Sequence, residues 1–344
     1  MSKQDIIDYK ENRISTGGIS TVFIHKDTKA IIKKTPVCDI NRAKLNRICS
    51  PQPESSDYNI LSELGVPIPK LVTGFIEADT AYVVEGLLER KTLTSYIKDK
   101  IMNLDYRFLS NHSTAKQLIQ KIGTILTVAE TLENHTPFFF QDLKPDNLFF
   151  TSKNKNSKDI KSEQLYIVDM GCLLHSEQDS IEGSPEYTHP SLFDPEQELD
   201  IDQIQVGYKY SLGVIAMEVL LGDSREIEID KTLIQSFENN TEENPTLAYK
   251  CSLDRLEKVK QTWDSTISAQ PFDQKHPLYS YKDEIELIEK LLRPAFEILS
   301  DENSLVNENS SVNNESYTED DCFSSSSNSD DASYENEYEE QSDD

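Results

Sequence analysis

The feature that most constrains this chain is the stretch at residues 139 to 150, FFQDLKPDNLFF, in which a polar loop lies between two apolar runs. Asp142, Lys144 and Asn147 occupy the loop. An Asp can accept a hydroxyl proton, a Lys can neutralise charge on a moving phosphoryl group, and an Asn can bind a metal ion, so the spacing is typical of phosphoryl transfer. The alternative interpretation is a polar turn between two buried strands.

Charge is distributed very unevenly along the 344 residues. Of the net charge of −28, residues 301 to 344 contribute 15 acidic groups and no Lys, Arg or His, which leaves −13 for the rest. This tail is rich in Ser, Asn, Asp and Glu and has too little apolar content to form a core, so we expect it to be disordered. The acidity argues against binding of nucleic acid or anionic membranes by the chain as a whole.

The cysteines and the N-terminus indicate the compartment. Five widely spaced cysteines form no CxxC pair, which predicts neither a disulfide framework nor a zinc site and fits a reducing cytosol. The first 13 residues are polar, and no apolar run approaches the length of a membrane span. We therefore expect a soluble protein with no signal peptide and no transmembrane segment.

Hydrophobic periodicity divides the chain into two regions of different type. Up to about residue 90 the pattern predicts mainly strands, with a Gly-containing hairpin at 14–22, a third strand at 29–33, further strands at 71–75 and 81–84, and one helix at 57–64. Beyond it the pattern predicts helices at 115–132, 210–221, 252–264 and 282–298, and a strand pair at 148–150 and 165–168. The sequence therefore predicts an α+β fold with a small β-rich lobe and a larger helical lobe.

From about residue 12 to 298 the motifs resemble those of the eukaryotic-like protein kinase superfamily. The QDLKPDN loop is similar to the kinase catalytic loop. The resemblance implies that Asp142 accepts the substrate proton, that Lys144 contacts the γ-phosphate of ATP and that Asn147 binds a metal ion. The sequence YIVDMG at 166–171 is similar to the DFG motif with Met for Phe, which implies that Asp169 holds Mg²⁺ or Mn²⁺ against the phosphates.

The same resemblance implies a bilobal kinase-like fold. Residues 1–12 are then an N-terminal extension, 13–86 the kinase N-lobe, 87–300 the C-lobe and 301–344 the disordered acidic tail. The segment STGGISTV at 15–22 is similar to the phosphate-covering loop, with Ser in place of both outer glycines. It implies ATP contacts by Thr16, Gly17, Gly18 and Val22, in a loop of reduced mobility.

The sequence AIIK at 30–33 is similar to the strand that carries the ATP lysine. Lys33 is the favoured candidate, because strand alternation places it on the same face as Ile31, the expected adenine contact. Lys34 remains the alternative.

The carboxylate partner of that lysine is expected on the helix at 57–64. Asp57 is favoured by counting back from Leu64, and Glu54 is the alternative. The segment VEGL at 84–87 is similar to the link between kinase lobes, which implies that backbone groups of Glu85 and Leu87 bind adenine.

Three positions depart from the kinase pattern. Gln141 replaces the Arg that usually precedes the catalytic Asp, so we expect no activation by phosphorylation of the activation loop. Ser191 stands where a Glu is expected at the end of the activation segment, and Tyr208 where an Asp usually braces the catalytic loop. These positions concern scaffolding and regulation, whereas the residues expected to carry the chemistry are present.

A basic run lies at residues 26 to 47 of this acidic chain. We hypothesise that Arg42, Lys44 and Arg47 bind a polyanion, such as an inositol phosphate or a phosphoinositide headgroup, that activates the protein. The alternatives are a solvated basic face and a docking site for the acidic tail.

Together these features predict a Ser/Thr protein kinase, because Lys144 follows the catalytic Asp by two positions as in Ser/Thr kinases. The rivals are a pseudokinase scaffold that binds nucleotide or polyanion, a lipid or small-molecule kinase, and other chemistry on the same fold. The Glu-rich C-terminus resembles export signals of effector kinases from Legionella-like intracellular bacteria, which implies an effector secreted into a host cell. An autoinhibitory or solubilising tail is the alternative.

Overall fold

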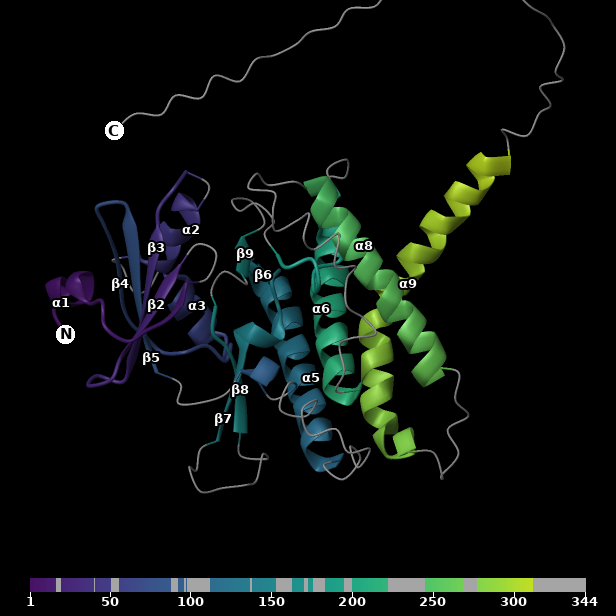
Figure 1. Cartoon of the computed structure of the whole chain (residues 1–344), viewed down its shortest axis with the longest axis horizontal. Helices are drawn as coiled ribbons and strands as arrows, with labels where there is room; N and C mark the ends of the chain where they lie inside the picture. The colour runs from purple at the N-terminus through teal and green to yellow at the C-terminus, as the bar shows by residue number, and fades with distance from the viewer. Residues whose placement is uncertain are drawn as a thin grey trace, which may run out of the picture. The chain divides into compact units, whose positions relative to one another are not determined.

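The computed structural model describes residues 1–16, 20–39, 41–50, 56–87, 92–95, 97, 112–136, 138–152, 163–169, 173–175, 183–194, 200–221, 245–268 and 277–311. The predicted phosphate-loop residues Gly17 and Gly18, the candidate Glu54 and most of the acidic tail lie outside these ranges. Contacts divide the chain into two units, Met1–Asp301 and Glu302–Asp344. The first unit is mixed α+β, with a small antiparallel sheet and a set of helices (Figure 1).

A five-stranded sheet forms the N-terminal part, in the order β1-β2-β3-β5-β4 and with every neighbouring pair antiparallel. Its strands are β1 (Arg13–Thr16), β2 (Thr21–His25), β3 (Ala30–Pro36), β4 (Leu71–Glu77) and β5 (Thr80–Gly86). The sequence pattern predicted these strands, because β-branched and aromatic residues between short turns favour a pleated, half-buried surface.

Two short helices cross between β3 and β4, namely α2 (Arg42–Ile48) and α3 (Asp57–Glu63). The sequence predicted α3 but not α2. Helix α3 begins where the Ser56 hydroxyl accepts the Asn59 N–H at 3.4 Å, and it ends before Gly65, whose φ of +77° is readily adopted only without a Cβ.

The N-terminal residues cover one face of the sheet. Helix α1 (Lys3–Asp8) has a capping box at Ser2 and buries Ile6 against a cluster that includes Ile32. Lys34 reaches the same segment and donates hydrogen bonds to the carbonyls of Ile7 (2.7 Å) and Tyr9 (2.6 Å). The stretch predicted as an extension is therefore packed onto the sheet.

Helices and two small strand pairs make up the rest of the first unit. The helices are α5 (His112–His135), α6 (Ile201–Leu221), α8 (Pro245–Thr262), which continues as a π-helix at Trp263–Ser268, and α9 (Lys282–Ser311). Strand β7 (Leu148–Ser152) pairs antiparallel with β8 (Glu163–Ile167), as predicted, and β6 (Phe138–Phe140) pairs with β9 (Leu173–His175). Helix α9 runs past the boundary expected at residue 300, because extending an existing helix costs far less than starting one.

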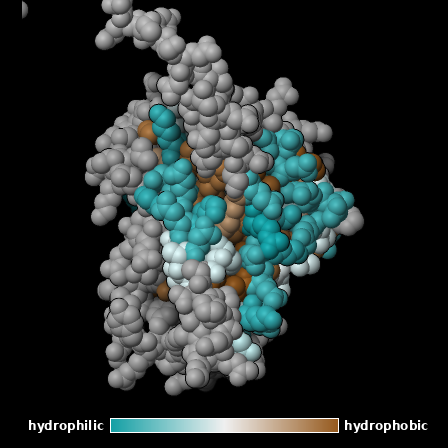
Figure 2. Space-filling view, turned by 90° about the vertical axis from the view of Figure 1, so that its right-hand side faces the viewer, coloured by the Kyte–Doolittle hydropathy of each residue, from teal (hydrophilic) through white to brown (hydrophobic). Residues whose placement is uncertain are grey.

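Among the described residues, α6 is the one helix long and apolar enough to cross a membrane, and 78% of its most apolar window is buried within the protein. This is the character of a core helix. Gly207 allows its close approach to the turn at Pro190–Leu192, since a Cβ there would lie 2.4 Å from a methyl carbon of Leu192. On the side where α8 lies, the described surface is mostly hydrophilic around a narrow hydrophobic strip (Figure 2).

Candidate active site

The loop between β6 and β7 brings its three predicted residues into contact. Lys144 Nζ lies 2.9 Å from Asp142 Oδ2, and the Asn147 side-chain amide donates to the Asp142 carbonyl at 3.0 Å. Pro145 begins a single 3-10 turn that ends at Asn147 and turns the chain into β7. A carboxylate, an ammonium group and an amide are thus held within one turn, which is the donor and acceptor set that phosphoryl transfer requires.

Asp169 comes two positions after the end of β8, and the residue before it contacts this loop. The Val168 N–H donates to the Asn147 carbonyl at 3.0 Å, which ties the chain before Asp169 to the turn at Pro145–Asn147. The Asn147 carbonyl oxygen of the side chain and the Asp169 carboxylate are hard oxygen donors, a chemistry that suits Mg²⁺ or Mn²⁺ completed by phosphate oxygens. The part of the chain that the structure describes contains no group of three or more His, Cys, Asp or Glu side chains placed so that they could hold a metal ion by themselves.

Ser184 is a site residue that the sequence analysis missed. Its N–H donates to Asp142 Oδ1 at 2.9 Å, and its hydroxyl accepts from Lys144 Nζ at 2.6 Å. Ser184 lies 40 positions after Lys144, so no local spacing pointed to this contact; the only signal was its place in the segment GSPEYTHPS at 183–191. The segment thereby presents a backbone donor to the Asp142 carboxylate and a hydroxyl acceptor to the Lys144 ammonium group.

A buried ion pair anchors the segment at residues 183–191. Arg255 of α8 lies 2.7 Å from Glu218 of α6, and both side chains are 3% exposed. Arg255 also donates to the Glu186 carbonyl at 3.2 Å, and the Tyr187 hydroxyl contacts both Glu218 carboxylate oxygens at 3.1 and 3.2 Å. Burial raises the pKa of Glu218 while Arg255 opposes that rise, and burial together with Glu218 raises the pKa of Tyr187.

Ser191 and Tyr208, the two positions that depart from the expected Glu and Asp, each have a defined hydrogen-bond partner. Ser191 accompanies His189, whose Nδ1 accepts the Ser191 N–H at 3.2 Å and lies 2.8 Å from its hydroxyl. Tyr208 is 1% exposed and donates to Glu133 of α5 at 2.7 Å. Tyr208 therefore links α6 to α5. The anchoring of the 183–191 segment is supplied by Glu218 and Arg255, which spacing alone did not indicate.

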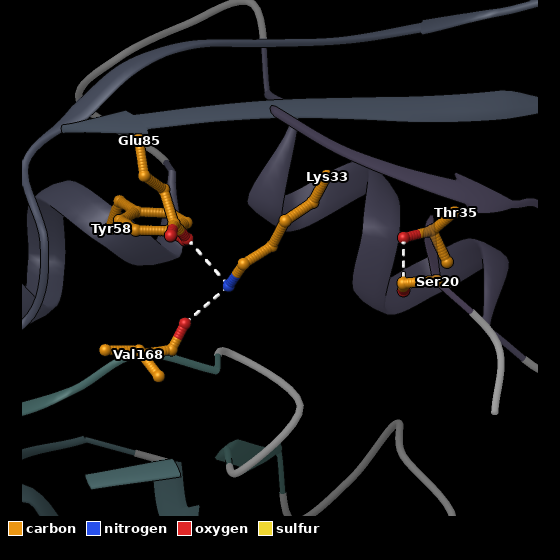
Figure 3. Close-up of polar contacts among 6 residues, drawn as sticks. All are labelled: Ser20, Lys33, Thr35, Tyr58, Glu85 and Val168. Carbon is orange, nitrogen blue, oxygen red and sulfur yellow. Dashed lines mark hydrogen bonds and ion pairs between the residues drawn. The ribbon is translucent and has the colours of Figure 1, made fainter. Parts of the chain in front are cut away.

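Lys33 projects from β3 toward the strand that precedes Asp169 (Figure 3). Its ammonium group donates to the Val168 carbonyl and lies 3.1 Å from Glu85 Oε1. Tyr58 of α3 donates its hydroxyl to the same carboxylate oxygen. Lys34 lies on the opposite face of the strand and is bound to the carbonyls of Ile7 and Tyr9, so of the two candidates it is Lys33 that reaches the chain before Asp169.

The carboxylate beside Lys33 differs from the sequence-based expectation. Asp57 forms an ion pair with Arg47 of α2 at 3.3 Å, whereas Glu85 of β5 pairs with Lys33. The reason is strand register. Ile31 stands opposite Glu85 in the ladder, so Glu85, Ile31 and Lys33 share one face of the sheet.

Glu85 and Leu87, the predicted adenine contacts, have other partners in the structure. Glu85 lies inside β5 rather than in a linker, and its side chain is buried. The Leu87 N–H donates to the Lys29 carbonyl at 2.9 Å, so an adenine contact through that N–H requires this bond to be exchanged. The adenine contact through backbone groups of Glu85 stays a prediction, and the structure adds a contact of its carboxylate with Lys33.

The remaining described residues of the predicted phosphate-covering loop lie on or next to strands of the sheet. Val22 is the ladder partner of Lys33, and it shares with Ile31 the face that bears Lys33. Thr16 ends β1 and is the ladder partner of Thr21. Where Ser replaces the last glycine of the loop motif, the Ser20 hydroxyl lies 2.8 Å from the Thr35 hydroxyl of β3 (Figure 3).

The basic residues at 26–47 are dispersed. Arg47 pairs with buried Asp57, and Arg42 lies 4.0 Å from Asp39 and 3.6 Å from Asp79. Lys44 lies on α2 with Arg42 and Arg47, while Lys33 and Lys34 point to opposite faces of β3. The basic side chains of this run therefore contact several different carboxylates and backbone carbonyls.

No protein-family model matches the chain, and no curated protein matches it either.

Proposed function

We propose that the protein is a Ser/Thr protein kinase of divergent, bilobal type, which transfers the γ-phosphate of ATP to protein hydroxyl groups. The observation that carries the proposal is the hydrogen bond from Lys33 to the Val168 carbonyl. It joins the candidate phosphate-binding lysine of the sheet to the chain that leads into Asp169, itself tied to the Asn147 turn. Three sequence segments predicted for one reaction therefore lie together.

Each residue has a defined task in this reaction. Asp142 accepts the proton of the attacking hydroxyl, Lys144 neutralises charge on the transferred group, and Lys33 holds the remaining phosphates. Asn147 and Asp169 would hold Mg²⁺ or Mn²⁺, which when bound would neutralise charge on the phosphates. The lysine–serine contact at Lys144 and Ser184 supports a site built to receive a hydroxyl substrate.

The decisive experiment is transfer of labelled phosphate from ATP to generic protein substrates and to cell lysate, with Mg²⁺ or Mn²⁺. An Asp169→Ala variant serves as control. We expect label on protein with the wild type and none with the control. No label under any condition would exclude the kinase and favour the pseudokinase scaffold. Label that persists in the control would show that the transfer does not depend on Asp169, and it too would exclude the proposed activity. Label on lipid or small molecules alone would favour a lipid or small-molecule kinase.

Two further elements of the proposal rest on the sequence. An added arm with inositol phosphates tests the polyanion hypothesis for Arg42, Lys44 and Arg47, and charge reversal of Arg42 and Lys44 should abolish any stimulation. Secretion into a host cell, suggested by the Glu-rich C-terminus, is tested by a translocation assay with and without residues 335–344.

A further inference from the structure

We infer that Glu85 of β5 is the carboxylate that positions Lys33 for phosphate binding, in place of the helix carboxylate on α3. The inference rests on the proposed kinase function and names a positioning residue for it. A lysine that holds phosphates needs a fixed carboxylate, because its flexible four-carbon stem otherwise samples many rotamers.

Geometry makes Glu85 that carboxylate. Its Oε1 lies 3.1 Å from Lys33 Nζ, and its side chain is 3% exposed against 19% for Lys33. A buried charge of this kind is stable only when it is paired and hydrogen-bonded. Glu85 meets both conditions, since Tyr58, itself 2% exposed, donates its hydroxyl to the same oxygen.

Tyr58 fixes the position of Glu85 in turn. The phenol extends from α3, the helix on which the partner of Lys33 was expected, and it contacts the same carboxylate oxygen as Lys33 (Figure 3). Burial, followed by the negative charge of Glu85, raises the pKa of Tyr58, so this hydroxyl remains a donor at neutral pH. The helix therefore acts on Lys33 through a tyrosine and a strand glutamate.

Asp57 has a different task. Its carboxylate lies 3.3 Å from Arg47 Nε, with side-chain exposures of 5% and 18%. This pair joins α2 to α3, which places Tyr58, the next residue, against Glu85. Asp57 thus stabilises the helix that carries Tyr58.

The test measures binding of ADP with Mg²⁺ and of adenosine by calorimetry, together with phosphate transfer, in the full chain. We expect Glu85→Gln to lower transfer roughly ten- to hundredfold and to weaken ADP binding severalfold, because Lys33 is no longer held in place. Adenosine, which has no phosphate, should bind as in the wild type, and Glu85→Asp should restore part of the transfer. A merely structural defect would weaken both ligands.

Glu284→Gln is the matched control, because Glu284 is an equally buried carboxylate that pairs with Lys116 at 3.6 Å, on α9 rather than at the site. It should leave both ligands and transfer unchanged. If Glu85→Gln does not fold, Tyr58→Phe gives the second test. It should weaken ADP about two- to fivefold without affecting adenosine, since it removes one hydrogen bond on Glu85.

Three outcomes would overturn the inference. Glu85→Gln could retain wild-type ADP affinity and transfer, it could raise transfer, or the ADP-specific loss could follow Asp57→Asn instead. A wild type that neither binds ADP nor transfers phosphate overturns the proposed function and this inference with it, whereas the three outcomes above leave the kinase proposal standing.

Discussion

The loop at residues 142–147 and the cluster around Lys33 are assembled in opposite ways. In the loop, Asp142, Lys144 and Asn147 lie within six positions and contact one another directly. Around Lys33, the contacts come from β3, α3, β5 and the end of β8, over a span of 135 positions between Lys33 and Val168. A short motif carries its own geometry, whereas the second cluster depends on strand register and helix placement.

The loop should show the largest effect on chemistry. We expect Asp142→Asn to lower phosphate transfer roughly 10²- to 10⁴-fold, the usual contribution of a general base, while the shape of the side chain is kept. Transfer of labelled phosphate under saturating ATP measures the change. Asp146→Asn is the matched control, because Asp146 is exposed in the same turn, and it should be nearly neutral. Equal losses in both variants would mean that the loop is sensitive to substitution in general.

The anchor beneath the 183–191 segment should show the largest effect on stability. Arg255→Gln leaves Glu218 buried without its charge partner, which typically costs about 3–5 kcal/mol. Chemical denaturation measures it. Lys258→Gln on the same helix removes a more accessible pair with Asp254, whose side chains are 29% and 25% exposed, and should cost less than about 1 kcal/mol. Similar losses would contradict the assignment of Arg255 as the anchor.

The difference between the two clusters explains what could be predicted from the sequence. The strands of the five-stranded sheet, helix α3, the pair β7 and β8 and the four long helices were expected from their hydrophobic patterns, and the loop residues Asp142, Lys144 and Asn147 because their contacts are local. The pairing of Lys33 with Glu85 was not, since it follows from Ile31 lying opposite Glu85 in the ladder, and a one-residue shift in register would turn Glu85 to the other face. Counting residues along α3 pointed to Asp57, because helix spacing was used to predict the carboxylate partner of Lys33. That partner is determined by the register of the sheet instead.

The contact of Ser184 with Asp142 and the pairing of Glu218 with Arg255 were missed for a related reason. Each joins segments some 40 residues apart through loops and helix crossings, for which no residue pattern exists. Helix α1 was missed because its six residues bury a single side chain, Ile6, too few for a periodic signal.

His189 gives the anchored segment a pH dependence that the catalytic loop does not predict. Burial lowers the pKa of His189 to about 4 from its ordinary value of 6.5. The unfolded chain therefore takes up a proton as pH falls below 6.5 while the folded protein does not, so stability is full above that pH and declines toward pH 4. At pH 5 the loss should reach about 2 kcal/mol.

Denaturation midpoints between pH 7.5 and 5 measure this loss. His189→Asn keeps an acceptor for the Ser191 N–H but does not titrate, so its stability should fall less steeply with pH than that of the wild type. His25→Asn, at the end of β2, is the control and should retain the wild-type slope. If the slope of His189→Asn equals that of the wild type, other groups carry the acid sensitivity.

Ser184 should show the smallest effect, and it tests whether the local loop is sufficient alone. Ser184→Ala removes the hydroxyl that accepts from Lys144 but keeps the N–H that donates to Asp142. A hydrogen bond to a charged group contributes about 1.5 kcal/mol to the stability of the geometry that it holds. If Lys144 needs this bond to stay in place, transfer should fall by up to roughly tenfold, and the free energy of unfolding should fall by no more than about 1.5 kcal/mol. Ser184→Thr retains the hydroxyl and should restore transfer. If the alanine variant transfers phosphate at the wild-type rate, the loop positions Lys144 without help from the distant segment, and the contrast between a self-contained loop and an assembled Lys33 cluster becomes sharper.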